Sequence, residues 1–244
     1  MTLAKFLIQT IDGEIPFDFA FHLKEAVKYN NWFYNEKVHE YVFLEDIDGL
    51  YASDAKDYIP IGSVDFVLSY YKKHCNISVE PINIPKELNK YEFLQRKVFE
   101  GDKIDEICSD PNKYFFIKDI SGFKKTTDIL PCKHIPRDKK ILVSEKIDIL
   151  SEFRCFVYNK RLLDVKGYIN DSFLYPDINI IKRMIEAYTN SPRAYTLDVA
   201  ISSNMKTVLI EVHQFFSCGL YGFADYRFLC NMFISTHREI LESK

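Results

Sequence analysis

The most regular pattern of apolar residues lies near the C-terminus. Residues 195–201 and 207–213 are runs of apolar and β-branched residues, and each run carries one carboxylate, Asp198 or Glu211. The connector 202–206 is short, so the two runs predict a β-hairpin that brings the two acids together. Two carboxylates that face the same way are typical of a divalent-cation site. Lone acids on the solvated face of an antiparallel sheet are the alternative.

Strand and helix patterns alternate in the first third of the chain. Residues 3–10 and 41–44 are apolar runs that predict strands, and residues 18–30 have the apolar spacing of a helix. A second predicted helix extends to about residue 74, with Ser63 as its N-cap. The order strand–helix–strand–helix predicts a small α/β unit.

A stiff connector follows this unit, because two prolines lie in the segment 81–85. We therefore predict an N-terminal α/β domain over residues 1–88 and a second domain over residues 89–244. The second domain divides into lobes of about 89–145 and 146–244.

The second domain has a mixed pattern of strands and helices, which is typical of an α+β fold. Its apolar runs predict strands at residues 115–119, 141–147, 152–158 and 162–169, the last two joined by the turn 159–161. Helical spacing predicts a helix over residues 177–189 and a long helix after Gly222.

Composition narrows the class of protein. The chain has 244 residues, of which 47% are hydrophobic, enough for a sizeable core, and its net charge of −3 indicates no general attraction to nucleic acid. The start is too short and polar for a signal peptide, and no apolar run approaches the ~20 residues of a membrane span. The cysteines form no C-x-x-C pair, so we expect six reduced thiols in a cytoplasmic protein: Cys75, Cys108, Cys132, Cys155, Cys218 and Cys230.

An ordered set of short motifs resembles the ATP-grasp superfamily, in particular its small stand-alone members, over roughly residues 91–225. The motifs are a strand ending in Lys118, the segment 121–127, Ser144-Glu145-Lys146-Ile147, Ser151-Glu152-Phe153-Arg154-Cys155-Phe156-Val157, the strand with Asp198, and Glu211-Val212-His213. The resemblance implies an ATP-grasp fold, in which a small N-terminal domain precedes two α+β lobes that clasp ATP.

The resemblance also implies roles for cations. Lys118 and Arg154 would act on the phosphates as catalytic and ATP-binding residues, and Lys124 and Lys125 would lie in a loop that covers them. Ordinary strand-end or solvated charge is the alternative for the lysines. An arginine inside a strand beside aromatic residues needs an anionic partner. For Arg154, a structural ion pair with Glu152 is the alternative.

The adenine would be held at the hinge between the lobes, by backbone groups of Glu145, Lys146 and Ile147. The Glu145 carboxylate could accept a ribose or amino hydrogen bond, or it could be an exposed strand-end acid.

The metal ligands implied are Asp198, Glu211 and His213. Many ATP-grasp proteins have Asn at the last position, and imidazole suits Mn²⁺ better than Mg²⁺. His213 is therefore a candidate ligand, a support for a ligand or a substrate contact. ATP with Mg²⁺, or with Mn²⁺, is the expected cofactor pair.

The implied activity is an ATP-dependent ligase that joins a carboxylate to an amine through an acyl-phosphate. A phosphotransferase without ligation needs the same residues and stays open. A non-catalytic nucleotide-binding module is disfavoured, because the cations and both acids are present. The expected partner is a small-molecule or peptide substrate with a carboxylate, and Arg96, Lys166 and Arg193 are candidate substrate contacts or surface charges.

Overall fold

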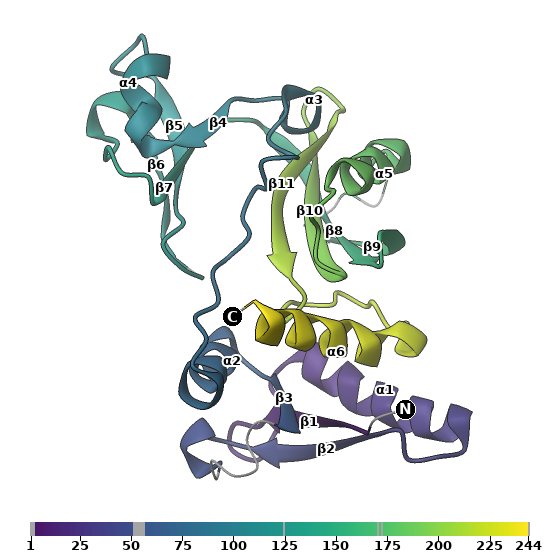
Figure 1. Ribbon diagram of the computed structural model, residues 1–244. Helices are drawn as coiled ribbons and strands as arrows, with labels where there is room; N and C mark the ends of the chain where they lie inside the picture. Colours follow the sequence, from purple (N-terminus) through teal and green to yellow (C-terminus); the bar gives the residue numbers. More distant parts are fainter. Residues whose placement is uncertain (1–2, 51–56, 124, 170, 172, 244) are drawn as a thin grey trace.

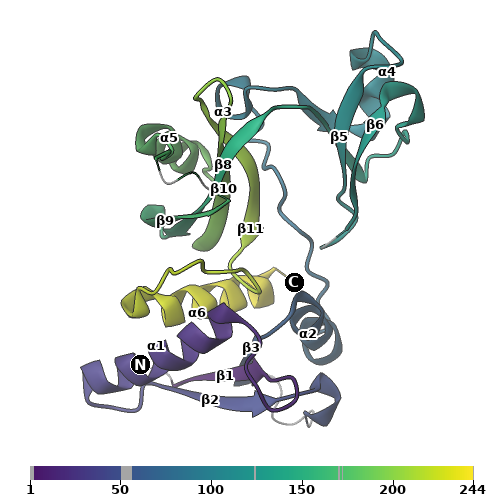
Figure 2. The same cartoon turned by 180° about the vertical axis from the view of Figure 1, so that it is seen from behind.

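Three β-sheets follow one another along the molecule in the computed structural model (Figure 1). The structure describes residues 3–50, 57–123, 125–169, 171 and 173–243. A parallel sheet forms the N-terminal end, a four-stranded antiparallel sheet forms the middle, and a second antiparallel sheet forms a distal lobe, as the reverse view also shows (Figure 2).

The N-terminal sheet has the order β2-β1-β3, with all pairs parallel. Its strands are β1 (Ala4–Gln9), β2 (His39–Leu44) and β3 (Tyr58–Ile61), and its helices are α1 (Asp18–Tyr34), η1 (Ile47–Gly49), α2 (Val64–Tyr70) and η3 (Tyr71–Cys75). The predicted N-cap is confirmed, because the Ser63 hydroxyl accepts a hydrogen bond from the Phe66 amide at 3.1 Å. The sequence did not predict β3, which is short and contains Pro60 at the sheet edge.

The distal lobe is an antiparallel sheet in the order β4-β7-β5-β6. Its elements are β4 (Val98–Glu100), η4 (Gly101–Lys103), α4 (Ile104–Ile107), β5 (Tyr114–Asp119), β6 (Thr127–Pro131), η5 (Cys132–His134) and β7 (Ile141–Glu145). The short helix α3 (Tyr91–Leu94) precedes this lobe and packs with the middle sheet through Phe93 and Leu94. A small core under the sheet includes Phe99, Ile104, Phe115 and Val143.

The middle sheet has the order β11-β10-β8-β9. Its elements are β8 (Ile149–Tyr158), β9 (Arg161–Ile169), α5 (Ile178–Ala187), β10 (Ala194–Ser202), β11 (Thr207–Gln214) and α6 (Tyr226–Glu242). Side chains alternate between the two faces of a strand. Phe153 and Cys155 of β8 pack with α5, whereas Phe156 packs with α6 and the N-terminal domain. The face away from α5 is therefore also the face of Glu152 and Arg154.

Helix α6 joins the middle sheet to the N-terminal sheet and α1. Its residues Leu229 and Phe233 share one core with Phe6 and Leu23 of the N-terminal domain and with Phe156 of β8. Because this C-terminal helix completes the N-terminal core, the boundary near residue 88 stays a prediction.

The expectation of six reduced thiols is wrong for two of them. Cys108 follows α4 and Cys132 follows β6, and these adjacent ends of the distal lobe bring the two sulfurs into a disulfide. Sequence spacing could not reveal this pair, because 24 residues and two strands separate its members. The other four cysteines are buried thiols, as expected: Cys75, Cys155, Cys218 and Cys230.

Within the described residues, no helix has the length and apolar character needed to cross a membrane.

Candidate active site

One row of charged residues crosses the middle sheet on the face away from α5. Glu211 of β11 pairs with Asp198 of β10, Asp198 pairs with Arg154 of β8, and Arg154 pairs with Lys166 of β9. Direct cross-strand partners lie on the same face of a sheet. A bulge beside Asp198 leaves Ile210 without a partner on β10. Bulges of this kind re-aim side chains near functional sites.

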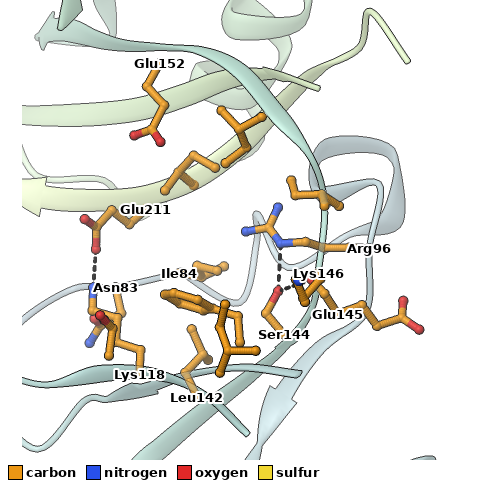
Figure 3. Close-up of a pocket in the computed structure, with 16 residues that line it drawn as sticks. Asn83, Ile84, Arg96, Lys118, Leu142, Ser144, Glu145, Lys146, Glu152 and Glu211 are labelled. Carbon is orange, nitrogen blue, oxygen red and sulfur yellow. Dashed lines mark hydrogen bonds and ion pairs between the residues drawn. The ribbon is translucent and has the colours of Figure 1, made fainter. Parts of the chain in front are cut away.

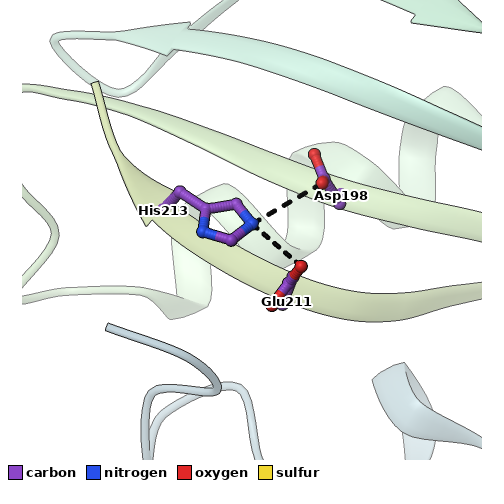
Figure 4. A group of neighbouring side chains, drawn as sticks. All are labelled: Asp198, Glu211 and His213. Atoms are coloured by element: carbon purple, nitrogen blue, oxygen red, sulfur yellow. Dashed lines mark ion pairs between the residues drawn. The ribbon is translucent and has the colours of Figure 1, made fainter. Parts of the chain in front are cut away.

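The predicted acidic pair is confirmed as a cross-strand pair, and His213 lies beside it (Figure 4). His213 Nε2 is 2.9 Å from Glu211 Oε1 and 3.7 Å from Asp198 Oδ2. One ligand atom from each of the three residues lies within 4.8 Å of the others. Two carboxylates and an imidazole at this spacing are a donor set that fits a divalent cation of the Mg²⁺ or Mn²⁺ type.

The Glu211 carboxylate is held in its charged form. Burial would raise its pKa, but the hydrogen bond and charge of His213 and the charge of Lys118 outweigh burial and lower the pKa to about 2. Glu211 is therefore ionised at neutral pH and can bind a cation.

Arg154 has a different partner from the one considered from sequence. Its Nε and Nη2 donate to the two oxygens of Asp198 at 2.9 and 2.8 Å, and Nη1 donates to the Gly219 carbonyl at 3.1 Å. Glu152 instead accepts a hydrogen bond from Tyr168 Oη at 2.7 Å. The alternative of a structural ion pair between Arg154 and Glu152 is therefore wrong. Asp198 lies directly across from Arg154, and both of its carboxylate oxygens accept hydrogen bonds from the guanidinium.

A cavity of about 380 Å³ lies between the middle sheet and the distal lobe. Figure 3 shows Lys118 and Glu211 at one end and Arg96 and Ser144 at the other, with Ile84 and Leu142 between them. Lys118 Nζ forms an ion pair with Glu211 across the cavity. The remaining lining residues are Asn83, Phe116, Thr127, Ile129, Glu145, Lys146, Ile147, Ile149, Glu152 and Ile210.

The predicted hinge lines this cavity. Lys146 and Ile147 follow the end of β7, and within the described chain no backbone hydrogen bond engages either residue. Their backbone groups are thus free to bind the edge of a base. The Glu145 side chain points away, where it accepts hydrogen bonds from Lys113 Nζ at 2.9 Å and from the Lys97 amide at 3.0 Å.

Arg96 is a buried cation at the hinge end of the cavity. Its Nε donates to Ser144 Oγ at 2.8 Å, and its Nη1 donates to the Leu94 and Leu209 carbonyls at 3.0 and 2.8 Å. Burial lowers the pKa of Arg96 to about 10. Its hydrogen bonds join β7 of the distal lobe to β11 of the middle sheet.

Like Asp198, Arg154 and His213, the other predicted site residues do not line the cavity, or they lie outside the described residues. Lys166 pairs with Asp164 at 2.9 Å on the sheet face beside Arg154. Arg193 lies near Glu239 of α6, with Nε 3.8 Å from Oε1. Lys125 is an exposed loop residue, and Lys124 lies outside the described residues.

Sequence reasoning missed several residues that line the cavity or lie beside Arg154. Phe116 could have been found, because it lies two positions before Lys118 on β5 and so shares its face. Asn83 could not, because only the tertiary contact between its carbonyl and the Val212 amide, 2.8 Å, brings the connector to β11. The tyrosine pair Tyr168 and Tyr221, whose rings stack 5.0 Å apart beside Arg154, also depends on tertiary contacts.

Two lobes enclose the cavity, with the Lys118–Glu211 ion pair at one end and, at the other, backbone groups of the hinge, Lys146 and Ile147, that are unpaired within the described residues. This arrangement is that of an ATP-grasp protein. The model of one ATP-grasp domain family, family 2 of its clade, matches residues 93–230. The match covers more than half of the chain, and the chain belongs to this family. No curated protein sequence matches the chain significantly.

Solved structures with the same fold span nearly the whole chain. A D-alanine–D-alanine ligase from Bacillus anthracis complexed with ATP is 13% identical, with 100% of this chain and 99% of that chain covered and a TM-score of 0.53. The ATP-grasp ligase PsnB complexed with a minimal precursor is 10% identical (97% and 99% covered, TM-score 0.54). The macrocyclase MdnC from Microcystis aeruginosa MRC, bound with precursor peptide MdnA, is 10% identical (96% and 99% covered, TM-score 0.51). At these identities the likeness establishes the fold.

Proposed function

We propose that the protein is an ATP- and Mg²⁺-dependent ligase that joins a carboxylate to an amine through an acyl-phosphate. The observation that carries the proposal is the cluster of Asp198, Glu211 and His213, of which Glu211 lines the cavity between the lobes and forms an ion pair with Lys118 there. The similar structures named as ligases support the reaction class.

Each end of the cavity has a role in this proposal. The backbone of Lys146 and Ile147 would bind the adenine, and the apolar residues Ile84 and Leu142 would pack against its faces. The phosphates would lie at the Lys118 end, with Asp198, Glu211 and His213 as ligands of the cation. Mg²⁺, when bound, would neutralise charge on the phosphate oxygens.

Lys118 and Glu211, which form an ion pair, would exchange partners when nucleotide and cation bind. In the free protein each group neutralises the other. On binding, Lys118 would turn to phosphate oxygens while Glu211 turns to the cation, so that neither charge is left unpaired in a half-buried site. Arg154 would orient Asp198 through its two hydrogen bonds.

The substrate carboxylate would enter on the Lys166 side of the charged row, next to Arg154. A peptide or a small molecule would satisfy this site, and the amine would then attack the acyl-phosphate. A closed site would protect this intermediate from water.

Hydroxylamine trapping tests the proposal. Incubation with ATP, Mg²⁺, hydroxylamine and a set of peptide and small-molecule carboxylates should yield a hydroxamate and ADP. A stable phosphate on a hydroxyl acceptor, with no hydroxamate from any carboxylate, would instead establish the phosphotransferase.

A further inference from the structure

A short loop between β11 and α6, residues 217–222, is held by the first turn of α1. Asp18 is the first residue of α1, and one oxygen of its carboxylate accepts hydrogen bonds from the Leu220 amide at 2.7 Å and from the Tyr221 amide at 3.2 Å. The other oxygen accepts a hydrogen bond from the Phe19 amide at 2.7 Å. The carboxylate therefore joins α1 to this segment, which we call the clamp loop.

The clamp loop has a strained backbone. Ser217 and Tyr221 each have a φ angle of 49°, and Gly222 has a φ angle of 88°. A residue with a side chain is unfavourable in this left-handed region and stays there only when the surrounding contacts hold it. Ser217 is held because its hydroxyl donates to the Gly62 carbonyl at 2.7 Å. The hydrogen bond to Asp18 restrains the backbone of Tyr221 in the same way.

The clamp loop contacts Arg154 in two ways. The Gly219 carbonyl accepts a hydrogen bond from Arg154 Nη1 at 3.1 Å, and the guanidinium carbon lies 5.2 Å from the centre of the Tyr221 ring. Gly219 and this ring are closely packed, because a β-carbon at position 219 would lie 3.0 Å from Tyr221 Cζ. The other two guanidinium nitrogens donate to the two oxygens of Asp198 at 2.9 and 2.8 Å. One guanidinium therefore joins the clamp loop to a candidate cation ligand.

This chain of contacts gives Asp18 a way to act on the cation site from a distance. Asp18 does not line the cavity, so its effect on the site passes through the clamp loop and Arg154. Without the carboxylate, the strained backbone of Tyr221 can relax and carry the Gly219 carbonyl away from Arg154. Because Arg154 engages both oxygens of Asp198, a shift of the guanidinium also shifts the oxygens that a cation would bind.

We propose that Asp18 is a positioning residue, which holds the clamp loop against Arg154 and thereby fixes the Asp198 carboxylate for the cation. The statement about the cation rests on the proposed function. The statement that Asp18 holds the loop in the free protein stands on its hydrogen bonds and on the strained backbone.

Thiol labelling of the free protein with N-ethylmaleimide, read by mass spectrometry, tests the hold on the loop without nucleotide. Cys218 lies in the clamp loop and is 6% exposed, whereas Cys155 of β8 is 0% exposed and reports global unfolding. Asp18→Ala should raise the labelling rate of Cys218 relative to Cys155 roughly tenfold, the effect of losing hydrogen bonds to a charged group.

Two further variants complete this experiment. Asp18→Asn keeps one acceptor oxygen and should raise the ratio less than Asp18→Ala; it also decides the question if the alanine variant does not fold. Asp65→Ala removes an exposed acid from the first turn of α2 and should leave the ratio unchanged. An unchanged ratio in the Asp18 variants would overturn the role of Asp18 in holding the loop.

Calorimetric titration with a non-hydrolysable ATP analogue, with and without Mg²⁺, tests the effect on the cation. The ratio of the two affinities should fall roughly 3- to 10-fold in Asp18→Ala, at or below the usual effect of groups that touch a metal ligand directly. Asp18→Asn should lower it less, and Asp65→Ala should keep the wild-type ratio. A general loss of stability would not change the dependence on Mg²⁺.

Two outcomes would overturn the effect on the cation. Faster labelling of Cys218 with an unchanged affinity ratio would leave Asp18 with a role in the loop alone. If the wild-type protein showed no Mg²⁺-dependent binding of the analogue, the proposed function and the effect on the cation would fail together, whereas the labelling ratio would still decide whether Asp18 holds the loop.

Discussion

Arg154 and Lys118 are both cations paired with a metal-site acid, yet their surroundings differ. Arg154 and Asp198 are 8% and 2% exposed and share two hydrogen bonds. The side chains of Lys118 and Glu211 are 23% and 24% exposed, and Glu211 keeps His213 as a second partner. The pair of Arg154 and Asp198 is thus a fixed part of the fold, whereas Lys118 and Glu211 can exchange each other for ligand partners.

We therefore predict opposite effects for the two alanine variants. Arg154→Ala removes both hydrogen bonds of the buried Asp198 carboxylate, leaves it only His213 at 3.7 Å, and should lower the free energy of unfolding by roughly 3–5 kcal/mol. Lys118→Ala should change it by less than about 1 kcal/mol but should weaken ATP binding. Urea unfolding and calorimetric titration measure the two effects. A fully stable Arg154→Ala variant would show that Asp198 does not depend on this pair.

Arg96 is predicted to fix the angle between the lobes. Arg96→Met removes hydrogen bonds to Ser144 and to the Leu209 carbonyl and should cost roughly 2 kcal/mol of stability. Nucleotide affinity should fall with it, because the hinge is no longer held. Lys97→Met, at the exposed neighbouring position, is the matched control for thermal unfolding. Equal melting temperatures for the two variants would rule out the role of Arg96.

At the scale of elements, α6 makes stability depend on pH through His237. This residue is buried on α6, and its Nδ1 is 2.9 Å from Tyr71 Oη of η3. Burial, with a smaller contribution from the Arg238 charge, lowers the pKa of His237 to about 4. In the unfolded chain a histidine titrates near 6.5.

The unfolded state therefore binds a proton below about pH 6.5 that the native state does not bind until about pH 4. As the pH falls from about 6.5 to about 4, His237 should lower the free energy of unfolding by roughly 3 kcal/mol. Its contribution ends there, whereas the lowered pKa of Glu211, about 2, reduces stability further in more acidic solution. His237→Gln should flatten most of this slope. A smaller slope should remain, because burial also lowers the pKa of His39. The exposed His134→Gln is the control, and an equal slope in the two variants would contradict the prediction.

The elements that sequence predicted are those with a long local pattern. Strands β10 and β11 were predicted because each is a continuous apolar run with a short turn between them, and their register places Asp198 opposite Glu211 as expected. Strands β3, β4 and β6 were missed, because three to five residues carry too little periodicity to separate a strand from a loop.

The same limit applies to the candidate site. The acids, Lys118 and the hinge lie in local motifs, so the sequence places them. The Arg154–Asp198 pair follows from strand order across the sheet, which local patterns do not give. Asn83 and the stacked pair of Tyr168 and Tyr221 depend on segments far apart in the chain.

At the scale of the whole molecule, the N-terminal sheet and the middle sheet share one core through α6. A fragment of residues 89–244 would expose the apolar face of α6 that includes Leu229 and Phe233. We predict that this fragment loses cooperative unfolding and binds a dye for exposed apolar surface, while the full chain does neither. Near-UV circular dichroism during urea unfolding measures the cooperativity, and the fluorescence of the dye measures the exposed apolar surface. A fragment that unfolds cooperatively would make residues 1–88 a separate domain.

The central claim is that Asp198, Glu211 and His213 hold a divalent cation together with ATP between the lobes. Calorimetric titration with a non-hydrolysable ATP analogue, with and without Mg²⁺, tests it most directly. The wild-type protein should bind the analogue more tightly with Mg²⁺. Glu211→Gln, which keeps the shape but removes the charge, should lose roughly tenfold or more in affinity, or at least ~1.4 kcal/mol. The exposed Glu100→Gln should bind like the wild type. Equal, metal-independent binding by the wild-type and Glu211→Gln proteins would contradict the account.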